Sequence, residues 1–177
     1  MSYFVHKITV SNWTTIDDNE ITDEEFELLK ADGITNDLKS NNNEISFWEI
    51  DSLSENELND ISISILTGRD EKQDLSIVAI PKADLDEHFR IKKSLGSTCY
   101  LKYADKHYDL IDMNYKKLGV LARIIIRTLQ NKDMVFDFIY AQQQRHIMEL
   151  ISNEDIVLDS NKGKLKKDYK EYMNKNH

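Results

Sequence analysis

Apolar residues in the first part of the chain recur at helical spacing in two segments. Residues 22–32 and 54–67 each begin with a capping box, in which a Thr or Ser precedes a Glu by three positions. Apolar side chains then return every three to four residues, as on the buried face of a helix. Gly33 and Gly68 follow where a left-handed helix end is expected. The pattern predicts one helix in each segment.

Three further segments have the pattern of strands. Residues 3–10 alternate between two faces, and residues 44–50 are rich in β-branched and aromatic side chains. Residues 75–80 form a nearly continuous apolar run, which is typical of a strand covered on both faces. Pro81, the single proline, ends this run and suits the first turn of a helix predicted over 83–95.

The second half opens with two segments that predict a β-hairpin. Residues 98–103 and 107–112 are its strands, and residues 104–106 are the loop between them. Two helical patterns follow, over 115–130 and 135–151, and the short break between them predicts a helical hairpin.

This order of elements predicts an α+β or α/β fold. We expect a mixed sheet, because strands that are joined through helices favour some parallel pairing. A single domain is expected over 1–160, in which an acidic part, 1–89, precedes a basic part, 90–160. A basic tail, 161–177, follows either as an amphipathic helix or as a flexible arm.

Charge divides the chain into two parts of opposite sign. Residues 11–89 hold 21 acidic and 5 basic side chains, whereas residues 90–177 hold 11 acidic and 17 basic ones, within a net charge of −9. Partners sense the field of a protein, while cores are built from apolar contacts, so this asymmetry bears on binding more than on fold.

The sequence lacks the common motifs of catalysis and cofactor binding. Its five glycines lie far apart, which excludes a P-loop and a dinucleotide-binding loop. It has no Gly-x-Ser-x-Gly, Cys-x-x-Cys or His-Glu-x-x-His pattern, so we expect no cofactor, no metal and no catalytic residue of a known motif. Cys99, the single cysteine, is expected in the core. Because no disulfide can form and no signal-peptide pattern is visible, a cytoplasmic location is expected.

The first functional hypothesis is a small interaction protein without catalytic activity. A dense group of carboxylates can bind a basic or nucleic-acid-handling protein through charge complementarity, although such charge also serves ordinary solubility. The size and charge are those of inhibitors, antitoxins and immunity proteins. The predicted partner-binding residues are Asp17, Asp18, Glu20, Asp23, Glu24, Glu25 and Glu27.

The second hypothesis is a nucleic-acid-binding regulator that uses the basic half. Two successive helices, the second with Gln142 and Arg145 on its surface, are the arrangement of a helix-turn-helix. Asp133 and Asp137 would then face phosphates, and an amphipathic hairpin with solvated charges is the alternative. The predicted phosphate contacts are Lys116, Arg123, Arg127, Arg145, Lys164, Lys166 and Lys167.

The third hypothesis is a divergent hydrolase or nuclease. His107 and Asp109 are two positions apart in a predicted strand and therefore share a face. Together with Glu87 and His88 from the preceding helix, they could form an acid–base or metal-binding cluster. The alternative is a hairpin edge whose polar side chains are solvated.

Overall fold

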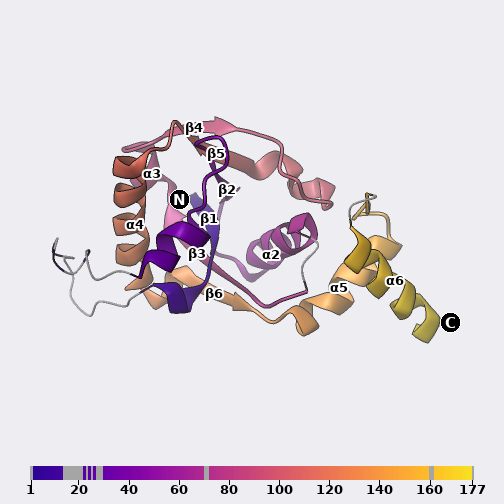
Figure 1. The fold of residues 1–177 in the computed structure, drawn as a ribbon. Helices are drawn as coiled ribbons and strands as arrows, with labels where there is room; N and C mark the ends of the chain where they lie inside the picture. Colours follow the sequence, from indigo (N-terminus) through magenta and orange to yellow (C-terminus); the bar gives the residue numbers. More distant parts are fainter. Residues whose placement is uncertain are drawn as a thin grey trace.

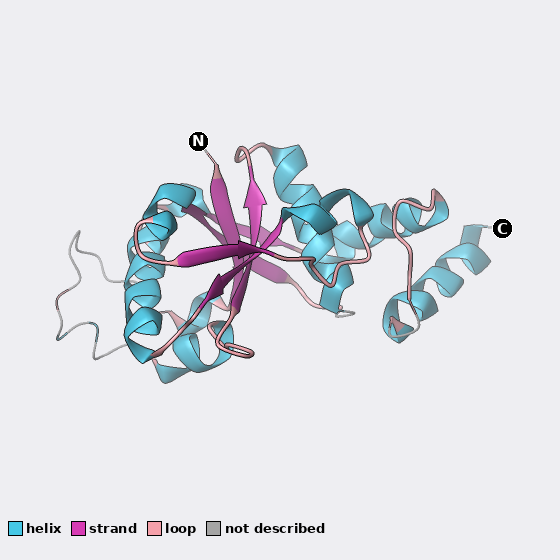
Figure 2. Cartoon of the chain, turned by 90° about the horizontal axis from the view of Figure 1, so that it is seen from above, coloured by secondary structure: helices cyan, strands magenta, loops and turns pink. Residues whose placement is uncertain are grey.

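The computed structural model describes residues 2–13, 22, 24, 26, 30–69, 72–159 and 162–176. In these residues a six-stranded sheet lies between two layers of helices (Figures 1 and 2). The order across the sheet is β4-β5-β2-β1-β3-β6. The strands are β1 (Tyr3–Ile8), β2 (Ile45–Ile50), β3 (Leu75–Pro81), β4 (Arg90–Lys93), β5 (His107–Ile111) and β6 (Val135–Phe138).

Helices cover both faces of the sheet. The α-helices are α2 (Glu55–Arg69), α3 (Lys82–Asp86), α4 (Tyr115–Leu129), α5 (Tyr140–Ser152) and α6 (Gly163–Asn176). The single-turn and 3₁₀ elements are η1 (Val10–Asn12), η2 (Gly33–Asp37), η3 (Leu101–Lys106) and η4 (Lys132–Met134). No helix in the described part of the chain has the length and apolar character needed to cross a bilayer.

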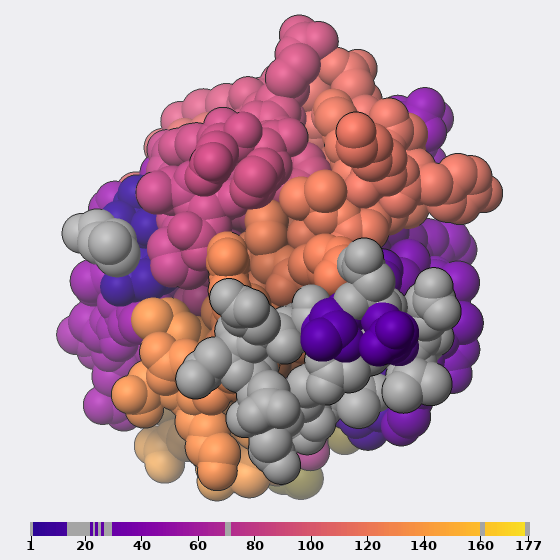
Figure 3. Space-filling model, turned by 90° about the vertical axis from the view of Figure 1, so that its left-hand side faces the viewer, coloured from indigo at the N-terminus to yellow at the C-terminus, as the bar shows by residue number. Residues whose placement is uncertain are grey.

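Each face of the sheet has its own hydrophobic core. On one face, β-strand residues such as Phe4 and Ile80 pack with Leu121 and Ile125 of α4. Figure 3 views the molecule from this side, with α4 in coral. On the other face, the core joins side chains from β1 and β3 to α2, α5 and α6. Residues 75–80 contribute to both cores, as their continuous apolar run predicts.

The fold is α+β, as predicted, but the expected mixed sheet is wrong. All five pairings between the described strands are antiparallel. Helix α2 does connect two strands of the same direction, β2 and β3. However, β1 lies between these strands and is antiparallel to both. The N-terminal strand thus occupies the position in which a parallel pair would have formed.

The predictions of the first half were mostly accurate in position. The first three strands and α2 fall within two residues of the predicted limits, and α4 does likewise in the second half. The predicted helix over 22–32 lies largely outside the described residues. The two glycines are not left-handed helix ends: Gly68 lies inside α2, Gly33 opens η2, and neither has a positive φ.

The predicted strand over 107–112 is confirmed as β5, but its predicted hairpin partner and the long helix before it are wrong. Helix α3 ends at Asp86, and residues 90–93 form an edge strand that pairs with β5. Instead of a strand, residues 98–103 contain an isolated bridge from Tyr100 to Ile156 and the start of η3. Ile91 stands alone among charged neighbours in β4, which is the composition of an edge strand rather than of a buried helix face.

The helical hairpin is also wrong, because β6 separates α4 from α5. Residues 135–138 alternate with a period of two, and Phe136 and Phe138 pack on the α2 side. As a result, α4 and α5 cover opposite faces of the sheet. Residues 163–176 form an amphipathic helix, α6, whose Leu165 is fully buried.

Candidate functional site

A polar cleft of about 440 Å³ opens beside the central strands of the sheet. It lies between the C-terminal half of α2 and strands β1, β2 and β5. Its lining includes His6, Lys7, Asp37, Trp48, Arg69 and His107. Imidazole, indole and charged groups therefore meet in one hollow.

His107 and Asp109 are buried on one face of β5, each with 8% of its surface exposed. The His107 Nδ1 lies 2.7 Å from the Ser94 hydroxyl oxygen, and its ring meets Trp48 edge to face at 4.8 Å between centroids. Burial lowers the pKa of His107, and the charge of Asp109 offsets this only in part. The Asp109 carboxylate accepts a hydrogen bond from the Ser46 hydroxyl at 2.9 Å.

The four-residue catalytic cluster of the third hypothesis is wrong. Glu87 and His88 are exposed in the turn after α3, and α3 packs on the α4 side of the sheet. His107 contacts Trp48, which belongs to the core on the opposite face. The solvated hairpin edge is wrong as well, because β5 is an interior strand. Among the described residues, no three His, Cys, Asp or Glu side chains are placed to hold a metal ion.

His6 is a cleft residue that sequence reasoning missed. Its Nδ1 lies 2.9 Å from the Ser46 carbonyl oxygen and its Nε2 lies 2.8 Å from the Asp37 carbonyl oxygen. Burial lowers the pKa of His6 and outweighs these two acceptors, which raise it. The Asp37 carboxylate in turn accepts from the backbone of Thr9 and the indole of Trp13, both at 2.8 Å. These hydrogen bonds hold η2 against the end of β1.

The segment 94–98 closes the cleft by a close backbone approach. A Cβ atom on Gly96 would lie 2.4 Å from the Trp48 ring, which is too short for any side chain. The Ser94 backbone amide donates to the His107 carbonyl at 3.1 Å and fixes the start of the segment. Glycine is therefore required here by proximity to the indole.

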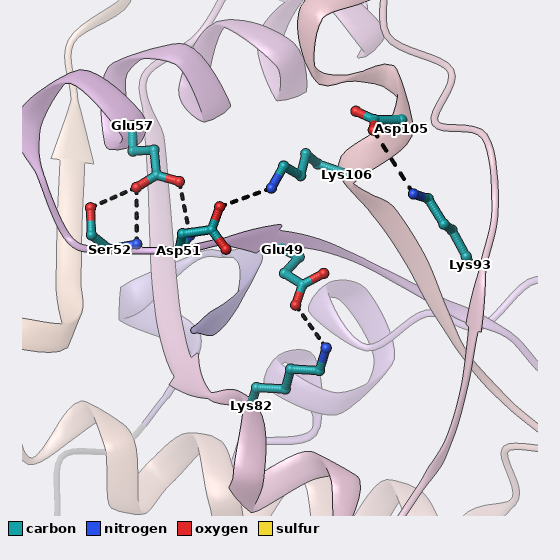
Figure 4. Close-up of polar contacts among 8 residues, drawn as sticks. All are labelled: Glu49, Asp51, Ser52, Glu57, Lys82, Lys93, Asp105 and Lys106. Atoms are coloured by element: carbon teal, nitrogen blue, oxygen red, sulfur yellow. Dashed lines mark hydrogen bonds and ion pairs between the residues drawn. The ribbon is translucent and has the colours of Figure 1, made fainter. Parts of the chain in front are cut away.

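Ion pairs join the acidic and basic parts of the chain. Lys106 lies 3.0 Å from Asp51 (Figure 4), and Lys102 lies 2.8 Å from Asp60. This happens because β2 and β5, which come from different halves of the sequence, are neighbours in the sheet. Two further pairs of the same kind are Lys92–Glu44 and Arg127–Asp84. The charge asymmetry of the sequence is thus partly neutralised inside the fold.

Glu49 and Lys82 form a further pair at the same end of β2 (Figure 4). Their charged groups lie 2.7 Å apart, and the Lys82 ammonium also stands 5.8 Å from the centre of the Tyr108 ring. Burial raises the pKa of the Glu49 carboxyl, but hydrogen bonds from Lys82 and Tyr108 outweigh it and hold the pKa below its ordinary value.

The residues predicted to bind nucleic acid do not form one surface. Arg123 stacks on the Phe26 ring at 4.1 Å, Arg127 pairs with Asp84, and Arg145 pairs with Glu149 at 2.9 Å. The remaining predicted contacts are exposed but divided between α4 and α6, which lie on opposite sides of the sheet. They are Lys116, Lys164, Lys166 and Lys167. With β6 between α4 and α5, the helix-turn-helix arrangement is wrong.

Six of the seven predicted partner-binding carboxylates lie outside the described residues. They are Asp17, Asp18, Glu20, Asp23, Glu25 and Glu27. The seventh, Glu24, is exposed. Phe26, which the structure does describe, packs beside α4. Cys99 is buried in the core, as predicted.

A second hollow, of about 480 Å³, runs along the β6 end of the sheet. Strand β6, the start of α2 and the start of α5 supply its walls. Sequence reasoning missed this groove, because its residues come from three separate segments and β6 itself was read as helix. No family model matches the chain, and neither does a curated protein or a solved structure.

Proposed function

We propose that this protein is a non-enzymatic interaction protein of the cytoplasm. It binds and modulates a larger, basic partner, such as a nucleic-acid-handling protein, in the manner of an inhibitor. The chain has a single cysteine, Cys99, which is buried and cannot form a disulfide within the chain, in keeping with a reducing compartment.

One observation carries this proposal: negative charge is concentrated in one short stretch of the sequence. Between Lys7 and Lys30, seven carboxylates stand with no lysine or arginine among them. Other carboxylates, such as Glu44, Asp51 and Asp60, form ion pairs with lysines of the same chain. Such a concentration of one sign attracts a basic partner and speeds its association, an effect that salt screens.

The test compares two sets of four charge reversals in an affinity purification from lysate, with and without nuclease. The first set is Asp23→Lys, Glu24→Lys, Glu25→Lys and Glu27→Lys. The matched control set, at exposed positions elsewhere, is Asp86→Lys, Glu87→Lys, Asp133→Lys and Glu171→Lys. Circular dichroism verifies that both variants fold.

We expect a protein partner that is still recovered after nuclease treatment. Its recovery should fall at least about tenfold with the first set of reversals and not with the control set. A tenfold loss of affinity corresponds to about 1.4 kcal/mol. Equal losses from both sets would contradict the proposal. A partner that disappears with nuclease would favour direct nucleic-acid binding by the basic residues instead.

A further inference from the structure

Strand β6 forms an open edge of the sheet. Within the described residues it pairs with β3 alone, from Val135 opposite Val78 to Phe138 opposite Leu75. In an antiparallel ladder, alternate residues direct their backbone N–H and C=O groups away from the neighbouring strand. These groups of β6 are therefore turned toward the outside, where another extended chain can pair with them.

The groove beside this edge has an apolar floor and an acidic rim. Phe136 and Phe138 are half-buried on the α2 side, where their rings join the core. Leu53 and Leu58 complete the floor. Among the residues that the structure describes, the polar lining is Glu55, Asn59, Asp137, Gln142 and Gln143, which includes two carboxylates and no cation.

The side chain of Asp137 lies on the face of β6 opposite to Phe136 and Phe138. Its side chain alternates with those of Phe136 and Phe138 and accepts a hydrogen bond from Ser76 at 2.5 Å. It remains exposed, so one of its oxygens can accept from a further donor. A strand added to β6 would place one set of side chains beside the two phenylalanines and the other set beside Asp137.

We propose that β6 receives an extended segment of the partner protein as a seventh strand. Apolar side chains of that segment enter the groove beside Phe136 and Phe138. Lysine or arginine side chains, in alternate positions, face Asp137. Main-chain hydrogen bonds supply affinity in this mode of recognition, and the alternating side chains supply selectivity. The inference rests on the proposed function, since it assigns the basic partner a docking strand.

Charge complementarity selects a basic segment over a second copy of this chain. Two β6 strands paired about a two-fold axis would gather both copies of Asp137 and of Glu55 around one groove. Like charges placed near each other across a strand pair are destabilising. A basic segment meets the opposite situation, because its lysine or arginine side chains then lie beside Asp137.

The test uses a fluorescein-labelled octapeptide of alternating Val and Lys as the probe, titrated with the full chain. Fluorescence anisotropy is expected to show saturable binding. A peptide with Glu in place of Lys, and one with two central prolines, which cannot complete the ladder, are each expected to bind at least about tenfold more weakly.

Charge reversal then tests the strand itself. Asp137→Lys is expected to weaken binding of the Lys peptide by about tenfold and to strengthen binding of the Glu peptide. Asp133→Lys is the matched control, because Asp133 is exposed in the adjacent η4 but does not line the groove; its effect should stay within about twofold.

Three results would overturn the inference: no saturable binding, equal binding of the Lys and Glu peptides, or equal effects of the two reversals. A dimer that depends on β6 would overturn it in favour of a second copy. If the peptide fails to bind while the reversals at 23–27 still abolish partner recovery, the docking strand is wrong and the proposed function stands. If the peptide binds but those reversals have no effect, the proposed function fails on its own.

Discussion

The two ends of the sheet are built differently. At one end, β4 carries Arg90, Lys92 and Lys93, and each of these cations has a carboxylate within 4 Å. Behind β4, the segment 94–98 closes over Trp48. At the other end, β6 has a single charged residue, Asp137, and an apolar groove beside it.

The difference shows how this fold protects one edge and leaves the other available. A row of charged side chains discourages another strand from adding to β4, because docking would have to desolvate or displace them. Strand β6 has no such row, and its short length alone limits unwanted pairing. We therefore expect stability to depend more on the β4 end and recognition to depend more on the β6 end.

The largest expected effect comes from deleting one aromatic side chain beneath segment 94–98 and one in β6. Trp48→Ala should lower the free energy of unfolding by about 3–5 kcal/mol, because Trp48 is 8% exposed and its loss leaves a cavity. Phe138→Ala should cost roughly half as much, since Phe138 is half-buried at an open edge. Urea unfolding measures the free energy of unfolding of both variants. Equal losses of stability would contradict the difference between the two regions.

A smaller effect is expected from closing the space above Trp48. Gly96→Ala forces its Cβ against the indole and should cost about 1–3 kcal/mol, measured by the same unfolding experiment. Gly163→Ala is the control, because nothing lies within 4 Å of its Cβ position at the start of α6. It should leave stability unchanged or raise it by less than about 1 kcal/mol. If Gly96→Ala leaves the free energy of unfolding unchanged, segment 94–98 is not held against Trp48.

Acidification should weaken the structure around the polar cleft that His6 and His107 line. The pKa values of His107 and His6 in the folded protein lie below the ordinary 6.5, chiefly because burial disfavours the imidazolium. Above pH 6.5, where both imidazoles are neutral in the folded and the unfolded chain, their contribution to the free energy of unfolding is complete. As the pH falls through it toward the folded pKa, the unfolded chain takes up protons that the folded chain does not, and the free energy of unfolding decreases.

Urea unfolding between about pH 8 and about pH 5 measures this dependence. His107→Gln should flatten the decline, whereas His88→Gln, in an exposed turn, should leave it as it is. If the free energy of unfolding falls with pH in the same way in the His107→Gln variant, His107 is not a cause of the decline.

The smallest change in stability is expected from uncovering the β4 edge. Arg90→Val with Lys92→Val removes two exposed ion pairs, which are worth about 0–1 kcal/mol each. The double variant should nevertheless self-associate as its concentration rises, because it creates an apolar edge strand. Sedimentation velocity detects this, with Lys116→Val on α4 as an exposed control outside the sheet. A monomeric double variant would show that charge is not what protects β4.

The elements predicted correctly from the sequence are those long enough to repeat their hydrophobic pattern several times. Helices α2 and α4 and the first three strands each show several repeats of their pattern, and their limits were close to the observed ones. Strands β4 and β6 have four residues each, which is too few repeats to separate a strand from a helix. The sheet order, with β1 between β2 and β3, is decided by long-range packing that no local pattern records.

The candidate sites follow the same rule. His107 and Asp109 could be paired from the sequence, because they are two residues apart in one strand. Ser94, Ser46 and His6 reach the cleft from other segments, and only the strand register brings them there. The groove at β6 depends on three segments in the same way. The charge asymmetry suggested two separate surfaces, but the pairing of β2 with β5 joins the two halves.

We expect a basic partner to dock at the β6 end of this protein. Hydrogen exchange of the full chain, measured with and without the partner recovered by affinity purification, locates the docking strand. Binding should slow exchange of the outward-facing amides of β6 and leave exchange of the β4 amides unchanged. Slowed exchange in β4, or unchanged exchange in β6, would contradict it.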